Sequence, residues 1–283
     1  MEKLFFKNFD LIKLINLIEG HINKKLTTDN DIEEFKENYL FLSVYEIVHS
    51  FYLNYIDINN CITISSTRTL VRKSYELLLQ LKYILEYQEE SNIRAKRYFL
   101  YKNYQKIDLL ISNGKDSTFD EQTLNKLKME KKHIEKSYVD SFINSNIKVN
   151  KFKDIKAWYM EKSNDCTKTG NLYELSEYLN MNYQYKHIYK NFCKDVHSTD
   201  SIINDTIRFF GKNIAIRNGE IEELLNEEPL TSEIEISSFT NYIVSEFLKC
   251  SSLFLNDKKL WEDYSAEFEK YYNQKMVFID VYI

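Results

Sequence analysis

The chain has 283 residues, of which 43% are hydrophobic and 29% are charged, and its formal net charge is −5. This balance is typical of a folded globular protein, and the negative charge argues against general affinity for nucleic acid or anionic membranes, while a local basic groove stays open. With only 5 glycines and 1 proline, the tight turns of a β-sandwich or a glycine-rich α/β fold have little support. We therefore predict an all-α multi-helix bundle.

Hydrophobic periodicity and capping residues divide the chain into helices joined by polar connections. These helices are predicted over residues 3–25, 32–55, 61–89, 91–112, 118–150, 153–162, 172–180, 182–197, 199–217, 237–256 and 258–273. The helix over 61–89 is apolar almost all round, which indicates a central position in the bundle. The helix over 118–150 is long and highly charged with a narrow apolar stripe, so we expect it to protrude.

The C-terminal third contains the best candidate for an exposed connection. Residues 219–236 are acidic, include no basic residue and hold the one proline of the chain. The last residues, 275–283, alternate weakly between apolar and polar types, which would suit a short strand. No internal repeat is evident, so we predict a single helical domain over 1–283.

Cysteine usage and the N-terminus bear on the compartment. The 4 cysteines are widely spaced and form no Cys-x-x-Cys pair, which favours free thiols in a reducing compartment. The N-terminal residues carry a charge every few positions and are typical of an amphipathic helix, not of a signal peptide. No apolar run approaches the roughly 20 residues that a bilayer requires. These features predict a cytoplasmic protein with no membrane partner.

Two polar ladders lie in otherwise hydrophobic stretches. The first consists of Arg68, Arg72 and Glu76, each four residues after the one before, so that a helix places them on one ridge. Arginine presents a planar fork that suits a carboxylate or a phosphate, and Glu76 could hold that fork or act as a general base. The alternative is a half-buried salt bridge that fixes the register of the helix.

The second ladder is Tyr185, Tyr189, Cys193 and His197, again at intervals of four. Histidine titrates near neutrality and is the usual proton shuttle, and tyrosine hydroxyls can orient a phosphate or a water. Cys193 and His197 also have the spacing of two metal ligands, but no second set accompanies them, so we predict neither a metal site nor a cofactor. The alternative is a histidine that is hydrogen-bonded in the core.

Basic residues alternate with aromatic ones between Arg94 and Lys106, with Arg97 at the centre of the pattern. Such a pattern can grip single-stranded nucleic acid through phosphate contacts and stacking. The alternative is an amphipathic helix with aromatic side chains inward and charges in water. A lysine-rich run over 126–136 is interspersed with glutamate, which favours a solvated surface.

Four blocks of this sequence resemble a widespread bacterial helical family that is known as a domain of unknown function. They are RKSYELLLQLKYIL (72–85), AKRYFLY (95–101), AWYM (157–160) and YKHIYKNFCKDVHS (185–198), and the resemblance covers roughly residues 35–200. It implies that Arg72, Glu76, Tyr189 and His197 form one site. The serine of the family's last block is Cys193 here, which puts in doubt any mechanism that needs that hydroxyl.

The architecture also looks like the helical nucleotide-binding (HEPN) superfamily of higher eukaryotes and prokaryotes. Many of its members are metal-independent ribonucleases of toxin–antitoxin and phage-defence systems. Their usual signature is an arginine four to six residues before a histidine, and no histidine of this chain has one. The likeness therefore extends to fold and setting, and Arg72 would have to supply the arginine from another helix.

These observations lead to competing hypotheses. In the first, a defence or toxin-type effector cleaves RNA with the catalytic residues Arg72, Glu76, Tyr189 and His197. Its substrate would be contacted by Arg68, Tyr185, Cys193 and Arg97. In the second, a non-catalytic module binds a nucleotide, a protein partner or a second copy of itself. A third hypothesis is hydrolysis of a small nucleotide. The chain carries no DNA-specific motif, and the common enzyme fingerprints for phosphate loops, dinucleotides, zinc proteases and serine hydrolases are absent.

Overall fold

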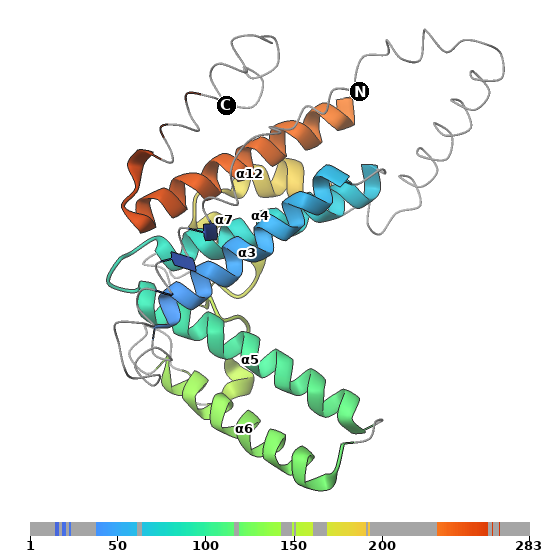
Figure 1. Ribbon diagram of the computed structural model, residues 1–283, viewed down its shortest axis with the longest axis vertical. Helices are drawn as coiled ribbons and strands as arrows, with labels where there is room; N and C mark the ends of the chain where they lie inside the picture. Colours follow the sequence, from blue (N-terminus) through green and yellow to red (C-terminus); the bar gives the residue numbers. More distant parts are fainter. Residues whose placement is uncertain are drawn as a thin grey trace, which may run out of the picture. The chain divides into compact units, whose positions relative to one another are not determined.

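The computed structural model describes the following residues: 38–60, 64–115, 119–142, 151–160, 169–190 and 231–259, with Ile15, Asn16, Glu19, Gly20, Asn23, Val149, Phe192, Glu262 and Ala266. The α-helices with three turns or more are α3 (Tyr39–Asn60), α4 (Ile64–Leu85), α5 (Ser91–Lys115), α6 (Glu121–Asp140) and α12 (Thr231–Leu255) (Figure 1). Shorter elements are η1 (Phe152–Asp154), α7 (Leu172–Tyr178), α8 (Asn182–Gln184) and η2 (Tyr185–Tyr189). No strand occurs in this part of the chain, which confirms the predicted all-α fold.

The chain divides into two compact units. The first, here called the α12 unit, holds residues 1–18, 47–81 and 183–283, and the second, the α6 unit, holds residues 19–46 and 82–182. The boundary falls inside two helices, since residues up to Glu46 of α3 and residues from Lys82 of α4 are grouped with the α6 unit. The single domain predicted from the sequence stays a prediction.

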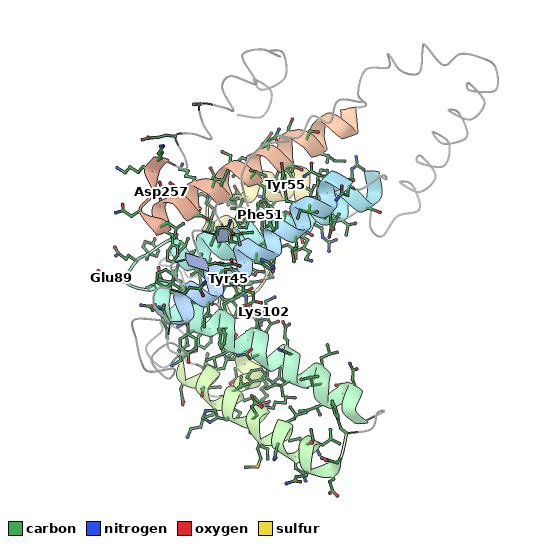
Figure 2. The ribbon with its side chains drawn as sticks, viewed as in Figure 1. Tyr45, Phe51, Tyr55, Glu89, Lys102 and Asp257 are labelled. Atoms are coloured by element: carbon green, nitrogen blue, oxygen red, sulfur yellow. The ribbon has the colours of Figure 1, made fainter. Side chains whose placement is uncertain are left out.

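Three helices build the described core of the α12 unit. Phe51 of α3, which is labelled in Figure 2, stacks on Phe247 of α12 with ring centroids 3.9 Å apart. The Asn54 amide donates to the Leu70 carbonyl at 2.6 Å and to Ser74 Oγ at 2.7 Å, which joins α3 to α4. These contacts involve fully or almost fully buried side chains, so they fix the helices that carry the candidate site.

In the α6 unit, α5 and α6 run side by side (Figure 1). Ile107 and Ile111 of α5 are buried, as are Ile134 and Tyr138 on the inner face of α6. Lys131 of α6 donates to Asp108 Oδ1 of α5 at 2.6 Å. The predicted helix over 118–150 therefore ends earlier, at Asp140, and packs along α5 through its narrow apolar stripe.

Two predicted boundaries are wrong. The helix expected over 153–162 is only the short 3₁₀ turn η1, and Trp158 lies in a turn with its ring edge-on to Tyr83 and Tyr98 at 5.4 and 5.0 Å. The connection expected over 219–236 ends by residue 230, because α12 begins at Thr231 and Ile236 is buried. In the first case Trp158 packs against rings that are distant in sequence, and in the second Ile236 is buried within the helix.

Several predictions lie outside the described residues. They include the helix over 199–217, the acidic residues 219–230 and the short strand over 275–283. No described helix has a stretch that is both long enough and apolar enough to cross a membrane.

Candidate functional site

Helix α4 carries the first ladder. Arg72 Nε lies 3.4 Å from Glu76 Oε1, and the two side chains are 26% and 31% exposed. An ion pair that is this accessible contributes little to stability, on the order of 0–1 kcal/mol. A purely structural role would therefore give the pair only a small effect on the fold.

The second ladder meets the first through one hydrogen bond. The Tyr189 hydroxyl donates to Glu76 Oε1 at 2.7 Å, so the same carboxylate oxygen faces both Arg72 and Tyr189. The Arg72 guanidinium also lies 5.8 Å from the centre of the Tyr189 ring. Three of the four residues predicted to be catalytic are thus brought together within the α12 unit.

The helix that presents Tyr189 is not a regular α-helix. Residues Tyr185–Tyr189 form a π-helical turn, in which the Lys190 N–H donates to the Tyr185 carbonyl. The Tyr185 and Tyr189 rings stack on each other with centroids 4.8 Å apart and an interplanar angle of 26°. Single π turns are rare and occur frequently at functional sites. We call Arg72, Glu76, Tyr185 and Tyr189 the Glu76 cluster.

An aromatic floor lies beneath this cluster. Tyr75 is fully buried, and its ring lies 5.6 Å from Tyr189 and 5.3 Å from Phe239 of α12. Burial raises the pKa of the Tyr75 hydroxyl well above its ordinary value, and the nearby Tyr242 and Tyr185 raise it further. Sequence reasoning missed Phe239 and Tyr242, because no local signal connects α12 with α4.

The remaining residues of the two ladders differ in placement. The Arg68 guanidinium lies 5.4 Å from the centre of the Phe192 ring, one turn of α4 before Arg72. Cys193 and His197 lie outside the described residues, so their place on the ridge stays a prediction. No group of three metal-binding side chains gathers among the residues that the structure describes.

The Glu76 cluster has the chemistry of an anion site. Glu76 Oε1 lies 3.4 Å from Nε of Arg72, the Tyr189 ring lies 5.8 Å from the guanidinium carbon, and the two Nη groups form the other end of this guanidinium. These Nη groups form the fork that binds a carboxylate or phosphate in two places. Glu76 holds the guanidinium by Nε, and Tyr189 holds Glu76, so the fork is oriented before a ligand arrives.

Arg97, a predicted substrate contact, belongs to the α6 unit. It is 3% exposed, and its Nε and Nη2 donate to the Ser141 carbonyl at 3.3 and 3.1 Å. Its guanidinium also lies 4.1 Å from the centre of the Phe142 ring. Arg97 thereby ties α5 to the end of α6, and its role toward a substrate stays a prediction.

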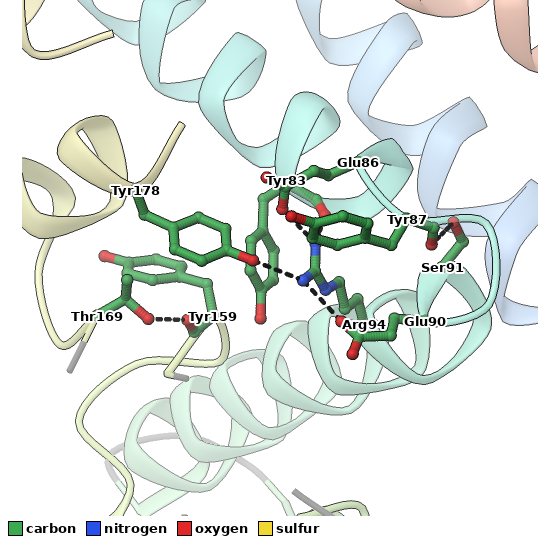
Figure 3. Close-up of polar contacts among 9 residues, drawn as sticks. All are labelled: Tyr83, Glu86, Tyr87, Glu90, Ser91, Arg94, Tyr159, Thr169 and Tyr178. Atoms are coloured by element: carbon green, nitrogen blue, oxygen red, sulfur yellow. Dashed lines mark hydrogen bonds and ion pairs between the residues drawn. The ribbon is translucent and has the colours of Figure 1, made fainter. Parts of the chain in front are cut away.

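Arg94 was missed as an important residue, because the sequence favoured charges in water on this helix. Its side chain has no exposed surface, and Figure 3 shows its guanidinium among Glu86, Glu90 and Tyr178. Its Nη1 donates to the Tyr83 carbonyl at 2.6 Å and to Glu86 at 2.9 Å, and its Nη2 reaches Tyr178 at 3.0 Å and Glu90 at 2.7 Å. We call these five residues the Arg94 cluster. The expectation of solvated charges is therefore wrong for both Arg94 and Arg97.

The Arg94 cluster binds its own cation completely. The Tyr83 ring lies 4.2 Å from the guanidinium carbon, so stacking adds to the hydrogen bonds. Four donor contacts and an aromatic wall leave no surface of Arg94 for a ligand. The cluster therefore joins the end of α4, the start of α5 and α7, and it serves the fold.

Comparison with known proteins gives one match. The family of unknown function DUF5677 matches residues 38–214, which is more than half of the chain. No curated protein and no solved structure shows a significant match. The matched stretch includes Arg72, Glu76, Tyr189 and His197, so the candidate site lies within the region that defines the family. The chain belongs to the family of unknown function DUF5677.

Proposed function

We propose that the protein is an effector that cleaves RNA at the Glu76 cluster by general acid–base catalysis. The observation that carries this proposal is the partly exposed side chain of Arg72, whose guanidinium lies beside Glu76 and the Tyr189 ring. A phosphodiester is the anion for which a planar two-point donor is well matched. The stacked Tyr185 and Tyr189 rings beside it suit a nucleobase.

The proposed reaction is a transesterification within the RNA strand. His197 accepts the proton of a ribose 2′-hydroxyl, whose oxygen attacks the adjacent phosphorus. Arg72 stabilises the negative charge of the phosphorane. The bond to the 5′-oxygen then breaks, and that oxygen takes a proton from the imidazolium of His197. The products are a 2′,3′-cyclic phosphate and a 5′-hydroxyl, and Glu76 and Tyr189 act as positioning residues.

The setting that we propose follows from the helical fold and from the likeness to the HEPN superfamily. In that setting the protein is a toxin-type or phage-defence effector in the cytoplasm of a bacterium. Growth arrest on expression would be the expected phenotype.

A second function is favoured by one observation. Glu76 Oε1 already faces both Tyr189 and Arg72, so this oxygen is engaged before any ligand binds. Such a carboxylate is suited to hold an arginine in place and is less suited to accept a proton. A non-catalytic module that binds a nucleotide through Arg72 would use the same geometry, and a protein partner would then supply the activity.

The test is expression in a bacterial host followed by growth curves and total-RNA integrity. Wild type is compared with His197→Ala, with Arg72→Ala and with Lys73→Ala, which removes an exposed charge from the next position of α4. We expect fragmentation of RNA with wild type and Lys73→Ala, and intact RNA with the other two at equal soluble yield. Cleaved ends should carry a 2′,3′-cyclic phosphate.

Intact RNA with all four proteins would contradict the ribonuclease function. The purified proteins would then be titrated with fluorescent nucleotides. Binding that Arg72→Ala abolishes, and that Lys73→Ala leaves unchanged, would establish the non-catalytic function in its place.

A further inference from the structure

The outward face of α6 carries three exposed lysines and a histidine. Seven exposed residues share one side of the helix, at the intervals of three and four that a helical stripe requires. They are Gln122, Asn125, Lys126, Met129, Lys132, His133 and Lys136. We call them the outer face of α6, and between its first and last residues it includes no carboxylate.

Among the acidic residues of α6, Asp140 lies on the same side as the outer face, one turn after Lys136, and the glutamates lie beside the face. With a step of 100° per residue, Glu130 lies on one flank of the outer face and Glu135 lies toward the side that packs on α5. Within the described part of the chain, Lys126, Lys132 and Lys136 take part in no ion pair. The lysine-rich run over 126–136 is largely exposed, as the sequence predicted, and its glutamates form no ion pair with these three lysines.

The arrangement costs helix stability. Lys132 and Lys136 of the outer face are four residues apart, and like charges at this spacing repel each other. A face that served only to keep the helix in water would gain from alternating signs. The repulsion is relieved when an anion binds, which is a reason for the charges to be where they are.

We infer that the outer face of α6 binds the phosphodiester backbone of RNA. The rise along a helix separates Lys126 from Lys132 by about 9 Å and Lys132 from Lys136 by about 6 Å, a row of cations that suits a repeating polyanion. A docking protein would need a buried apolar or aromatic anchor, and this face offers only Met129, which is 73% exposed. The contact would be independent of base sequence, because no aromatic side chain lies on the face.

This inference rests on the proposed function in one respect, the choice of RNA as the ligand. The outer face belongs to the α6 unit and shares no residue with the Glu76 cluster. Binding can be measured without cleavage, so the two proposals can fail separately.

The experiment measures fluorescence anisotropy with a short unstructured RNA whose riboses all carry 2′-O-methyl groups, which blocks cleavage. The test protein has Lys126→Glu, Lys132→Glu and Lys136→Glu. The matched control has Lys151→Glu, Lys153→Glu and Lys156→Glu, three exposed lysines of the same unit that lie outside α6. Circular dichroism establishes that both variants keep their helices.

We expect the test protein to bind at least about tenfold more weakly than the control at low salt. Loss of three phosphate contacts should also reduce the slope of log affinity against log salt by about 2. Equal affinity of the test and control proteins would overturn the inference. So would tight binding of poly-L-glutamate that disappears in the same test protein, since the face would then serve an acidic protein.

Discussion

The Tyr189 hydroxyl donates a 2.7 Å hydrogen bond to Glu76 Oε1, although the two residues are 113 positions apart. The bond connects the π turn η2 with the middle of α4, and it does so at a partly exposed carboxylate that also faces Arg72. One hydroxyl therefore determines where the carboxylate points, and the carboxylate determines where the guanidinium points. Removing the hydroxyl should disturb the site more than the fold.

Tyr189→Phe should lower the free energy of unfolding by about 1 kcal/mol, because it deletes one hydrogen bond to a charged but partly solvated group. The aromatic contacts with Tyr185 and Tyr75 remain. Urea denaturation of both single variants and the double variant with Glu76→Ala gives the coupling energy. In the Glu76→Ala background the Tyr189 change should cost almost nothing. Equal costs in both backgrounds would show that the bond does not hold the turn.

Arg94→Met should be far more damaging. It removes a fully buried cation and leaves Glu86 and the Tyr178 hydroxyl without their donor, a situation that typically costs about 3–5 kcal/mol. Arg94→Lys should also destabilise the protein, since one ammonium cannot reach four acceptors. The urea midpoint at constant slope measures both effects. As a control, Glu90→Gln should cost at most about 1 kcal/mol, because Glu90 is half exposed. A loss below that of the control would refute this role of Arg94.

Local signals predicted the helices well. The predicted ranges 91–112 and 172–180 correspond to α5 (Ser91–Lys115) and α7 (Leu172–Tyr178). Apolar periodicity supports the first, and Asn171 caps the second by accepting from the Glu174 N–H. Both signals lie within the segment itself. Trp158 was misassigned to a helix because its environment comes from Tyr83 and Tyr98, which precede it by more than 50 residues.

The candidate site was partly predictable for the same reason. The spacing of Arg72 and Glu76 on one helix indicates that they pair. Spacing does not indicate the contact of Glu76 with Tyr189; only the resemblance to the family placed these two residues in one site. Nothing in the sequence distinguishes the buried Arg94 from the half-buried Lys96 two positions later. The end of α4 and Tyr178 make that difference, and such long-range packing has no periodic signature.

Gly114→Ala should destabilise the protein by about 1 kcal/mol. Alanine gains up to about 1 kcal/mol over glycine in a helix, but overpacking costs about 1–3 kcal/mol. A Cβ at position 114 would collide with Phe119 Cδ2 and lie 3.0 Å from Leu124 Cδ2. Steric crowding should therefore win over helix propensity. Thermal and urea unfolding measure the net effect.

The sign of this effect should reverse when Phe119 is shortened. In a Phe119→Ala background the main collision is gone, so Gly114→Ala should become neutral or stabilising. If the change is destabilising by the same amount in both backgrounds, Phe119 is not the cause.

The stability of the α6 unit should depend on the charge of Glu46. Burial raises the pKa of this carboxyl above its ordinary value, and Lys102 and Lys106 counter only part of the shift. A carboxyl whose folded pKa is raised contributes stability that is complete below the unfolded pKa, about 4.3, and is lost as the pH rises through the folded pKa. Glutamine keeps the shape of the protonated form, so Glu46→Gln should be more stable than wild type at pH 7. The two proteins should become alike in acid, below about pH 4.

Chemical denaturation at a series of pH values measures the difference, with the exposed Glu130→Gln as the control that should show no such trend. A variant that is less stable than wild type at neutral pH would mean that attraction to Lys102 and Lys106 exceeds the cost of burial. Because the lysines and the buried surface act in opposite directions on one group, the sign of this single difference decides which of them dominates.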